Sequence, residues 1–351
     1  MEFSEKITKW YKHNQRDLPW RKTTDPYYIW LSEVILQQTR VKQGLSYYNK
    51  FVTHFPSIQN LANAKEDTVM KLWQGLGYYN RARNMHATAK HITNILNGEF
   101  PITYEEIIQL KGVGEYTAAA ISSFCFNEPK AVVDGNVYRL LSRYFGIRTP
   151  IDSTNGKNKF RSLANNLLNK NNPGVHNQAI MEFGALMCKP ISPDCLLCPL
   201  KDSCVSNNKN LVKMLPVKTK KTKSKKRYFN YLVITDGVKS YMEQRLEKDI
   251  WEKLYQFPNI ETRKEVETIP DYNQLINLDH LIVKNNHTFK QILSHQIIYA
   301  KFWLLYSEIQ LEDLAQLKLT PINNLNSYPV PKVVENYILH FPELFNSKSY
   351  L

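Results

Sequence analysis

The spacing of hydrophobic residues changes at about residue 210. Before that point, apolar side chains recur three and four positions apart, as on one face of an α-helix. Clear examples are Phe3, Ile7, Trp10 and Tyr11, then Trp30, Val34 and Ile35, then Ile107, Ile108 and Leu110. Residues 231–234 and 297–306 are instead rich in β-branched and aromatic residues, as strands are, and residues 333–341 return to helical spacing. We therefore predict a mainly α-helical first domain and a smaller α+β second domain.

The segment between the two patterns is strongly basic. Residues 218–227 read KTKKTKSKKR, with seven basic side chains and neither an acidic nor an apolar one. A segment of this composition cannot bury a core. We therefore predict a helical domain over residues 1–215, a basic linker over residues 216–227 and a second domain over residues 228–351.

Length and charge narrow the class of protein. The chain has 351 residues, enough for two domains that each bury a core, so a largely disordered protein is excluded. No stretch approaches the roughly 18 consecutive apolar residues of a membrane span. The amphipathic, charged N-terminus differs from a signal peptide, and we expect a cytoplasmic protein. With 46 Lys and Arg against 32 Asp and Glu, the net charge of +14 favours a polyanionic partner, nucleic acid ahead of an anionic membrane surface.

Four of the five cysteines lie close together, between residues 188 and 204. Cys188, Cys195, Cys198 and Cys204 are separated by six, two and five residues. Thiolates bind both zinc and iron–sulfur clusters. Zinc ribbons usually pair two short Cys-x2–4-Cys knuckles, whereas only the middle pair forms one here, so the spacing favours a [4Fe–4S] cluster over zinc. The fifth cysteine, Cys125, lies in an apolar run and is predicted to be buried.

Two glycines interrupt the helical pattern within residues 110–121, which read LKGVGEYTAAAI. Gly112 and Gly114 can adopt positive φ and let backbone N–H groups approach a ligand at the N-terminus of the next helix. We predict that Gly112, Val113 and Gly114 bind a DNA phosphate. A plain connection between helices is the alternative, but the three successive alanines that follow favour the close helix packing that a phosphate-binding hairpin needs.

Three motifs together resemble the helix–hairpin–helix DNA glycosylases: the Gly-Val-Gly hairpin, residues 133–139 (VDGNVYR) and the cysteine loop. Residues 30–39, 75–84 and 177–188 resemble the adenine DNA glycosylases of the MutY type within that superfamily. The resemblance is dense over residues 5–215 and thinner beyond. It implies a base excision repair enzyme that hydrolyses the N-glycosidic bond of adenine opposite 8-oxoguanine or guanine in double-stranded DNA. We expect it to act as a monomer, away from membranes.

Cleavage of an N-glycosidic bond needs an acid that protonates the base and an anion that stabilises the developing oxocarbenium ion. Glu33 lies among apolar residues that can keep its carboxyl group protonated near neutral pH. The resemblance implies that Glu33 protonates adenine N7 and that Asp134 stabilises the oxocarbenium ion, with or without a transient covalent adduct. Asn136 is expected to orient Asp134. From the residues alone, a surface glutamate and an ordinary Asp-Gly turn are the alternatives.

Tyr116 separates this chain from endonuclease III-like enzymes that also cut the DNA strand. Those enzymes carry a lysine two positions after the second hairpin glycine, and its amine forms a Schiff base with the sugar. Because Tyr116 occupies that position here, we predict base excision without efficient strand cleavage.

A base stacked in a duplex must be flipped out before it can be cut, and the gap must be filled. The resemblance implies that Gln38 and Tyr78 intercalate. Arg81 and Arg83 lie close enough in sequence to contact phosphates, whereas Tyr79 is expected in the core. Again by resemblance, the residues around the flipped adenine are Arg16, Trp20, Arg21 and Gln178.

Residues 228–345 resemble the Nudix-like domain with which this family recognises 8-oxoguanine. Residues 251–258 (WEKLYQFP) carry the match. The chain lacks the Gly- and Glu-rich signature of Nudix hydrolases, so we expect this domain to bind the lesion and not to hydrolyse nucleotides.

The family's lesion-reading loop is commonly Phe-Ser-His, and its best match here is Leu293, Ser294 and His295. The leucine keeps an apolar wedge, while the serine and histidine keep hydrogen-bonding groups. Residues 287–289 (HTF) offer a competing alignment.

Two other functions share some of these features. An endonuclease III-like glycosylase for pyrimidines or mismatched thymine would share the cysteine loop and the hairpin, but Tyr116, the Asp-Gly-Asn segment and the long C-terminal extension argue against it. A non-catalytic DNA-binding redox sensor would need neither Glu33 nor Asp134. The cluster is expected to be structural and to present Lys189 and Lys201 to DNA.

Overall fold

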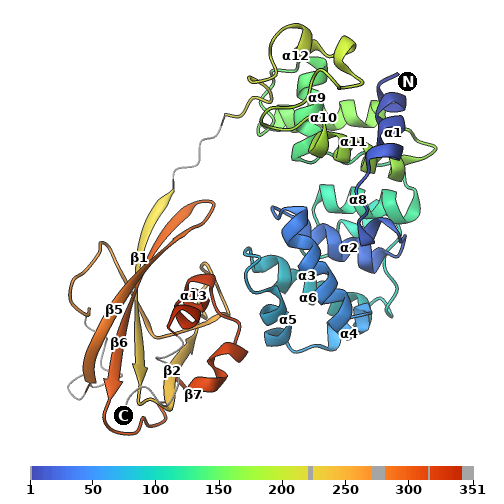
Figure 1. Ribbon diagram of the computed structural model, residues 1–351. Helices are drawn as coiled ribbons and strands as arrows, with labels where there is room; N and C mark the ends of the chain where they lie inside the picture. Colours follow the sequence, from blue (N-terminus) through green and yellow to red (C-terminus); the bar gives the residue numbers. More distant parts are fainter. Residues whose placement is uncertain (1, 220–223, 271–280, 315–316, 342–351) are drawn as a thin grey trace. The chain divides into compact units, whose positions relative to one another are not determined.

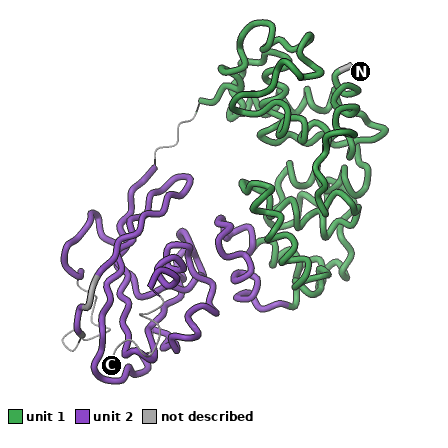
Figure 2. Tube along the Cα trace, viewed as in Figure 1, with its two compact units in different colours: residues 1–63, 84–221 green, residues 64–83, 222–351 purple. Residues whose placement is uncertain are grey.

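The computed structural model of the chain divides into two compact units (Figure 2). Unit 1 contains residues 1–63 and 84–221, and unit 2 contains residues 64–83 and 222–351. The structure describes residues 2–219, 224–270, 281–314 and 317–341. Within these residues, no helix is long and apolar enough to cross a membrane.

Unit 1 is helical, as the spacing of its apolar residues predicts (Figure 1). Its longer helices are α1 (Glu2–Asn14), α2 (Pro26–Leu36), α3 (Val41–His54), α4 (Ile58–Asn63), α6 (Asn80–Asn94), α8 (Glu115–Phe126), α9 (Gly135–Phe145), α10 (Thr154–Leu167) and α11 (Pro173–Leu186). Its short helices are α7 (Tyr104–Ile107), α12 (Val205–Asn208) and the 3-10 helices Pro19–Arg21 and Lys201–Ser203. Helix α6 begins in unit 2, because residues 80–83 belong to that unit.

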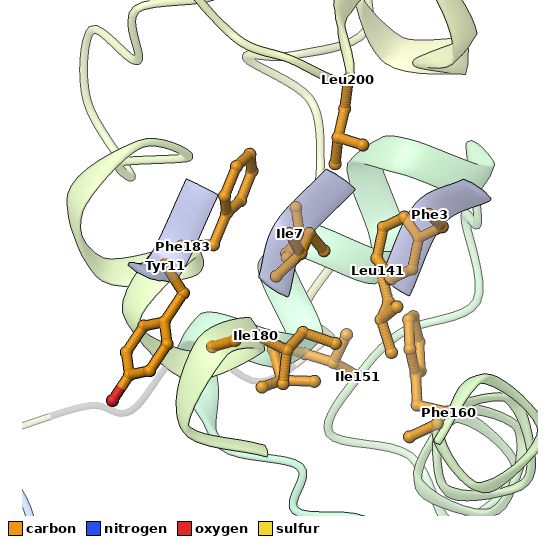
Figure 3. Packing of buried hydrophobic residues seen from close by; sticks show 13 residues of the cluster. Phe3, Ile7, Tyr11, Leu141, Ile151, Phe160, Ile180, Phe183 and Leu200 are labelled. Carbon is orange, nitrogen blue, oxygen red and sulfur yellow. The ribbon is translucent and has the colours of Figure 1, made fainter. Parts of the chain in front are cut away.

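The N-terminal helix packs its apolar face into one core of unit 1. Phe3, Ile7 and Tyr11 of α1 are buried against residues of α9, α10 and α11, among them Phe183. Figure 3 shows Ile7 among these side chains. The three residues lie four positions apart, so they share one face of the helix.

Helix α2 is buried on almost every side. Asp25 caps its N-terminus by accepting a hydrogen bond from the N–H of Tyr27 at 2.8 Å, and Pro26 occupies the first turn, where a missing N–H costs nothing. All seven residues from 29 to 35 are buried. A helix that is apolar all round lies inside a protein, so the one carboxylate in this stretch, Glu33, is carried into the interior.

Unit 2 contains helix α5 (Glu66–Trp73) and a mixed seven-stranded sheet (Figure 1). The strands are β1 (Lys225–Thr235), β2 (Lys239–Gln244), β3 (Tyr255–Gln256), β4 (Asn259–Thr262), β5 (Leu281–Ile292), β6 (Gln296–Ser307) and β7 (Lys318–Pro321). The order is β3-β2-β1-β6-β5, with β4 paired to β1 and β7 paired to β2. Strands β1 and β6 run parallel, and β5 and β6 form an antiparallel hairpin. The predicted α+β architecture is confirmed.

Helix α13 (Lys332–His340) covers one face of the sheet. The ring of Tyr337 stacks on Phe302 of β6 with centroids 4.2 Å apart, and Phe257 packs edge-on against both rings. Trp251, Leu254 and Phe257 are buried. The sequence segment 251–258 that resembles the Nudix-like domain therefore supplies core residues.

The basic segment predicted to be unpacked ends in a strand. Strand β1 begins at Lys225, and Arg227 is only 9% exposed. Its guanidinium forms ion pairs with Glu261 at 2.6 Å and Asp249 at 2.7 Å. The prediction that residues 218–227 cannot pack is therefore wrong for Arg227, because strand pairing and two carboxylates compensate its burial, whereas Lys225 and Lys226 enter the strand with exposed side chains. The domain boundaries inferred from the sequence stay a prediction.

Candidate active site

The predicted catalytic residues and the predicted adenine-binding residues line one open cavity of about 800 Å³ in unit 1. Helices α2, α8, α9 and α11 and the segment before α2 provide its wall. The predicted site residues on this wall are Glu33, Tyr116, Asp134 and Asn136, together with Arg16, Trp20, Arg21 and Gln178. The structure therefore brings together eight residues from five separate parts of the sequence. We refer to this space as the unit 1 cavity.

Glu33 is a buried acid with an unusual proton affinity. It is 6% exposed, and burial raises the pKa of its carboxyl group from 4.5 to about 7. A hydrogen bond from Tyr116 and the charge of Arg21 oppose this rise, while the nearby carboxylate of Asp134 adds to it. A carboxyl group with a pKa near the working pH is suited to general acid catalysis.

Tyr116 lies in the first turn of α8 and faces Glu33. Its Oη donates a hydrogen bond to Oε2 of Glu33 at 2.7 Å. Burial and the neighbouring carboxylates of Glu33 and Asp134 raise the pKa of Tyr116 well above its usual value, so the phenol stays protonated. Sequence reasoning treated Tyr116 only as a replacement for lysine and did not predict this contact.

Asp134 is the N-cap of helix α9 and not part of a simple turn. Its Oδ1 accepts hydrogen bonds from the backbone N–H groups of Asn136 at 2.9 Å and Val137 at 2.8 Å. Its Oδ2 accepts a third, from the side-chain amide of Asn136, at 2.7 Å. Burial raises the pKa of Asp134, and these hydrogen bonds oppose the rise. The positive end of the α9 dipole also favours a carboxylate at this position.

A chain of hydrogen bonds joins Asp134 to the cysteine loop. Oδ1 of Asn136 accepts from Nη2 of Arg139 at 2.9 Å. Nε of Arg139 in turn donates to the backbone carbonyl of Cys188 at 2.7 Å. The amide that holds Asp134 is thus itself held by a residue that fixes the start of the cysteine loop.

Sequence reasoning missed Glu182, which also lines the unit 1 cavity. It lies on α11 and is 1% exposed, with Arg16 and Arg21 both bonded to its carboxylate. A signal was present, because Glu182 follows the predicted pocket residue Gln178 by four positions and therefore shares its face of the helix.

The two hairpin glycines differ in conformation. Gly112 has a φ of +79°, as predicted, whereas Gly114 has a φ of −101° and caps helix α8, which begins at Glu115. The prediction of positive φ is therefore wrong for Gly114. A Cβ atom on Gly112 would lie 2.6 Å from Cβ of Asn84, whereas one on Gly114 would meet nothing within 4 Å. The fold requires glycine at 112 and leaves the helix N-terminus at 114 open, with Val113 buried between them.

The two predicted intercalating residues share a rare backbone conformation. Gln38 has a φ of +56° and Tyr78 a φ of +49°. Positive φ is uncommon for residues with a side chain and is often found at functional sites. Tyr78 is 40% exposed, whereas Tyr79 is buried, as predicted.

The two arginines after Tyr78 contact other groups of unit 2. The guanidinium of Arg81 lies 5.7 Å from the Tyr78 ring and donates to the carbonyl of Gly77 at 3.2 Å. Arg83 forms an ion pair with Glu252 at 2.8 Å. Their predicted contacts with DNA phosphates stay predictions.

Residues 293–295 form the tip between β5 and β6, and we refer to them as the tip loop. The N–H of Leu293 donates to the carbonyl of Gln296 at 2.8 Å and closes the turn. Ser294 Oγ lies within hydrogen-bond reach of Tyr78 Oη, also in unit 2. The competing residues 287–289 lie inside β5 instead, where Phe289 packs against Phe302.

The four clustered cysteines line one cavity of about 420 Å³. Arg143 lies on the same wall and is almost fully buried, with Nη1 3.5 Å from Sγ of Cys188. A buried cation beside thiolates suits an anionic metal cluster. Among the described residues, no three His, Cys, Asp or Glu side chains are arranged to hold a single metal ion. Cys125 is half-buried, whereas the sequence predicted it to be buried.

Models of two protein families match this chain. The HhH-GPD superfamily of base excision DNA repair proteins matches residues 31–166, and the NUDIX domain matches residues 230–340. The first match runs from α2 to α10 and includes residues 64–83 of unit 2, and the second covers most of the sheet of unit 2 and helix α13.

Adenine DNA glycosylases are similar to the chain over much of its length. The enzyme from Buchnera aphidicola subsp. Baizongia pistaciae is 36% identical over 321 residues, which cover 88% of each chain. The human enzyme is 40% identical over 211 residues, or 58% of this chain and 39% of the human one. Among solved structures, a thermostable thymine-DNA glycosylase is 28% identical with a TM-score of 0.55, covering 59% of this chain and 95% of its own. An endonuclease III–DNA complex at 22% identity shares the fold, with a TM-score of 0.52 over 60% of this chain and 95% of its own.

Proposed function

The chain belongs to the adenine DNA glycosylase family, and on this premise we propose that it removes adenine opposite 8-oxoguanine or guanine and leaves the DNA strand uncut. It is a hydrolase of base excision repair that acts on the N-glycosidic bond of adenine. The proposal rests mainly on one observation, that Glu33, Tyr116 and Asp134 all line the unit 1 cavity.

Glu33 supplies the proton that makes adenine a leaving group. With a pKa of about 7, a large fraction of its carboxyl groups is protonated at neutral pH. Tyr116 occupies Oε2, which leaves Oε1 to transfer the proton to N7 of the base. The side chains of Arg16, Trp20, Arg21 and Gln178 lie on the same wall and surround the base.

Asp134 stabilises the positive charge that develops on the sugar as the bond breaks. A fixed anion in a site with little water stabilises such a charge far more than it would in bulk water. The hydrogen bonds from Asn136 and Val137 hold the carboxylate in place before the reaction begins, so no reorganisation is needed.

The absence of strand cleavage follows from Tyr116. A lysine amine at this position would attack the sugar and form a Schiff base, which leads to strand scission. The phenol of Tyr116 is protonated and bonded to Glu33, so it offers no comparable nucleophile.

Three features support binding to duplex DNA. The open helix N-terminus at Gly114 suits a phosphate, because its N–H groups and dipole favour an anion. Gln38 and Tyr78 fill the space that the flipped adenine leaves. The tip loop, through Ser294 beside Tyr78, recognises 8-oxoguanine on the opposite strand.

Cys188, Cys195, Cys198 and Cys204 would hold a [4Fe–4S] cluster, with Arg143 beside it as a counter-charge. Such a cluster supplies a rigid cross-link among the four thiolates and can also carry electrons. The chain's own residues then present two exposed lysines of this loop, Lys189 and Lys201, to the DNA backbone.

The test uses a labelled duplex with one adenine opposite 8-oxoguanine, treated with the purified enzyme and then with or without hot alkali. We expect cleavage at the adenine only after alkali, and none with Glu33→Gln. A thymine–guanine duplex serves as the control. Cleavage without alkali would overturn the monofunctional assignment, and cleavage only at thymine would overturn adenine as the substrate.

A further inference from the structure

Glu182 binds two arginines in the wall of the unit 1 cavity, Arg16 and Arg21. Its Oε1 accepts from the backbone N–H of Arg16, from Nε of Arg16 and from Nη1 of Arg21, each at 2.9 Å. Its Oε2 accepts from Nη2 of Arg16 at 2.5 Å and from Nη2 of Arg21 at 2.8 Å. Both guanidiniums are therefore held by two-point contacts, which fix the plane and the direction of an arginine.

The two arginines are only partly covered, unlike the carboxylate beneath them. The side chain of Arg16 is 34% exposed and that of Arg21 is 13% exposed, against 1% for Glu182. Nη1 of Arg21 also donates to the carbonyl of Arg16 at 3.1 Å, which ties the two residues to each other. Glu182 thus lies behind the arginines, which keep free surface to present to the cavity.

Tyr11 completes this supporting layer from helix α1. Its ring lies 5.6 Å from the guanidinium of Arg21, and its Oη donates to Oε1 of Gln178 at 2.8 Å. Gln178 itself lines the unit 1 cavity. Every polar residue predicted to contact the adenine is therefore held from behind by Tyr11 or Glu182.

We propose that Glu182 is a positioning residue for adenine excision, which fixes Arg16 and Arg21 at the wall where the base binds without contacting the base itself. The inference rests on the proposed function and adds a residue to it. Arg21 is also close enough to Glu33 for its charge to favour the ionised acid. By neutralising part of that charge, Glu182 helps Glu33 to keep its proton.

A purely structural role makes a different prediction. The same ion pairs connect the segment before α2 to α11, and a role confined to that connection would change the stability of the enzyme alone. It would leave the pH dependence of the chemical step where it is in the wild type. The pH profile therefore separates the two roles.

The experiment measures single-turnover adenine release from an adenine–8-oxoguanine duplex between pH 5 and 9, with the full-length, cluster-containing enzyme. In Glu182→Gln, the charge of Arg21 is less well compensated, so Glu33 should lose its proton more easily. We expect the alkaline fall in rate to move about 0.5–1 pH unit lower and the rate at pH 7.5 to drop at least about tenfold. Arg21→Met should move the fall in the opposite direction.

Glu261→Gln is the matched control, because it also removes the charge of an arginine-paired glutamate but lies in unit 2. It should behave like the wild type. Glu182→Asp keeps the charge but shortens the reach; it should slow the reaction without moving the pH profile, and it serves if Glu182→Gln does not fold. A wild-type rate and pH profile in either folded Glu182 variant would overturn the inference. A wild type that releases no adenine would instead overturn the proposed function.

Discussion

Two buried glutamates in the wall of the unit 1 cavity have pKa values shifted in opposite directions. Burial raises the pKa of Glu33 to about 7, whereas burial of Glu182 is overcome by hydrogen bonds from Arg16 and Arg21, which hold its pKa at about 2. The difference lies in the donors. Glu33 accepts from the neutral phenol of Tyr116, and Glu182 accepts from two cations. Burial alone does not set the charge of a carboxyl group.

The different pKa values give the two carboxyl groups different roles. A carboxyl group that exchanges its proton near neutral pH can act as an acid, whereas one that is always ionised can only hold cations in place. The cavity thus contains one reactive and one supporting glutamate, and substitutions can separate them.

The largest effect is expected for Glu33→Gln. The amide keeps the shape of the side chain and can still accept the hydrogen bond from Tyr116, but it has no proton to give to adenine. We expect the single-turnover rate to fall by about 10³-fold or more, within the range known for loss of a general acid. Quenched-flow or manual time courses on the same duplex measure it. A loss below about tenfold would assign the acid to another residue.

Substitutions of the two glutamates should change the free energy of unfolding in opposite directions. At pH 8, ionised Glu33 costs folding free energy, because its pKa is higher in the folded protein than the usual 4.5. Glu33→Gln should therefore raise the free energy of unfolding, by up to about 3 kcal/mol. Glu182→Ala leaves two arginines without their carboxylate and should lower it by about 3 kcal/mol. Urea denaturation at pH 8 measures both.

The pH dependence of these stabilities gives a check on the signs. The cost of burying Glu33 appears as pH rises from about 4.5 to about 7, so the gain in Glu33→Gln should vanish by pH 4. The stabilisation by Glu182 is present above about pH 4.5 and is lost as pH falls toward about 2. A gain in Glu33→Gln that is equal at pH 4 and pH 8 would contradict the assignment of a raised pKa.

A smaller effect is expected for Tyr116→Phe. This substitution removes the hydrogen bond that favours ionised Glu33. The alkaline fall in rate should therefore move to higher pH by about 0.5–1 unit, and the rate below pH 6 should drop about three- to tenfold as the acid loses its orientation. A shift to lower pH would show that Tyr116 acts on Glu33 in another way.

The smallest effect on folding is expected at the hairpin. Gly114→Ala should lower the free energy of unfolding by only about 0.5–1 kcal/mol, because its φ of −101° and the open space around it accept a Cβ atom and the remaining cost is that alanine is a poorer N-cap than glycine. It should still weaken binding to duplex DNA. Gly112→Ala should destabilise the enzyme by about 1–3 kcal/mol, since both its φ and Asn84 oppose a side chain. Thermal melts and fluorescence anisotropy separate the two effects, and equal melting of both variants would contradict this distinction.

The sequence predicted those features that depend on neighbours along the chain. Apolar spacing gave the helices of unit 1 and the strands of unit 2, and the apolar surroundings of Glu33 indicated its burial. Family resemblance then selected eight residues that line one cavity.

Features that depend on distant partners were not predictable in this way. Glu182 and Arg16 are 166 residues apart, so no local sequence pattern predicts their ion pair. The positive φ of Gln38 and Tyr78 could not be predicted either, because neither residue type indicates this conformation. At Asp134 the sequence suggested a turn, and only the position of α9 shows that it is a helix cap.

The most direct test of the account is the pH profile of single-turnover adenine release by the wild-type enzyme, measured beside Glu33→Gln. If buried Glu33 is the acid, the wild-type rate should fall as pH rises through about 7, and the slow residual rate of the variant should show no such fall. A wild-type rate that stays constant from pH 6 to 9, or a variant with the same fall, would contradict the role of Glu33.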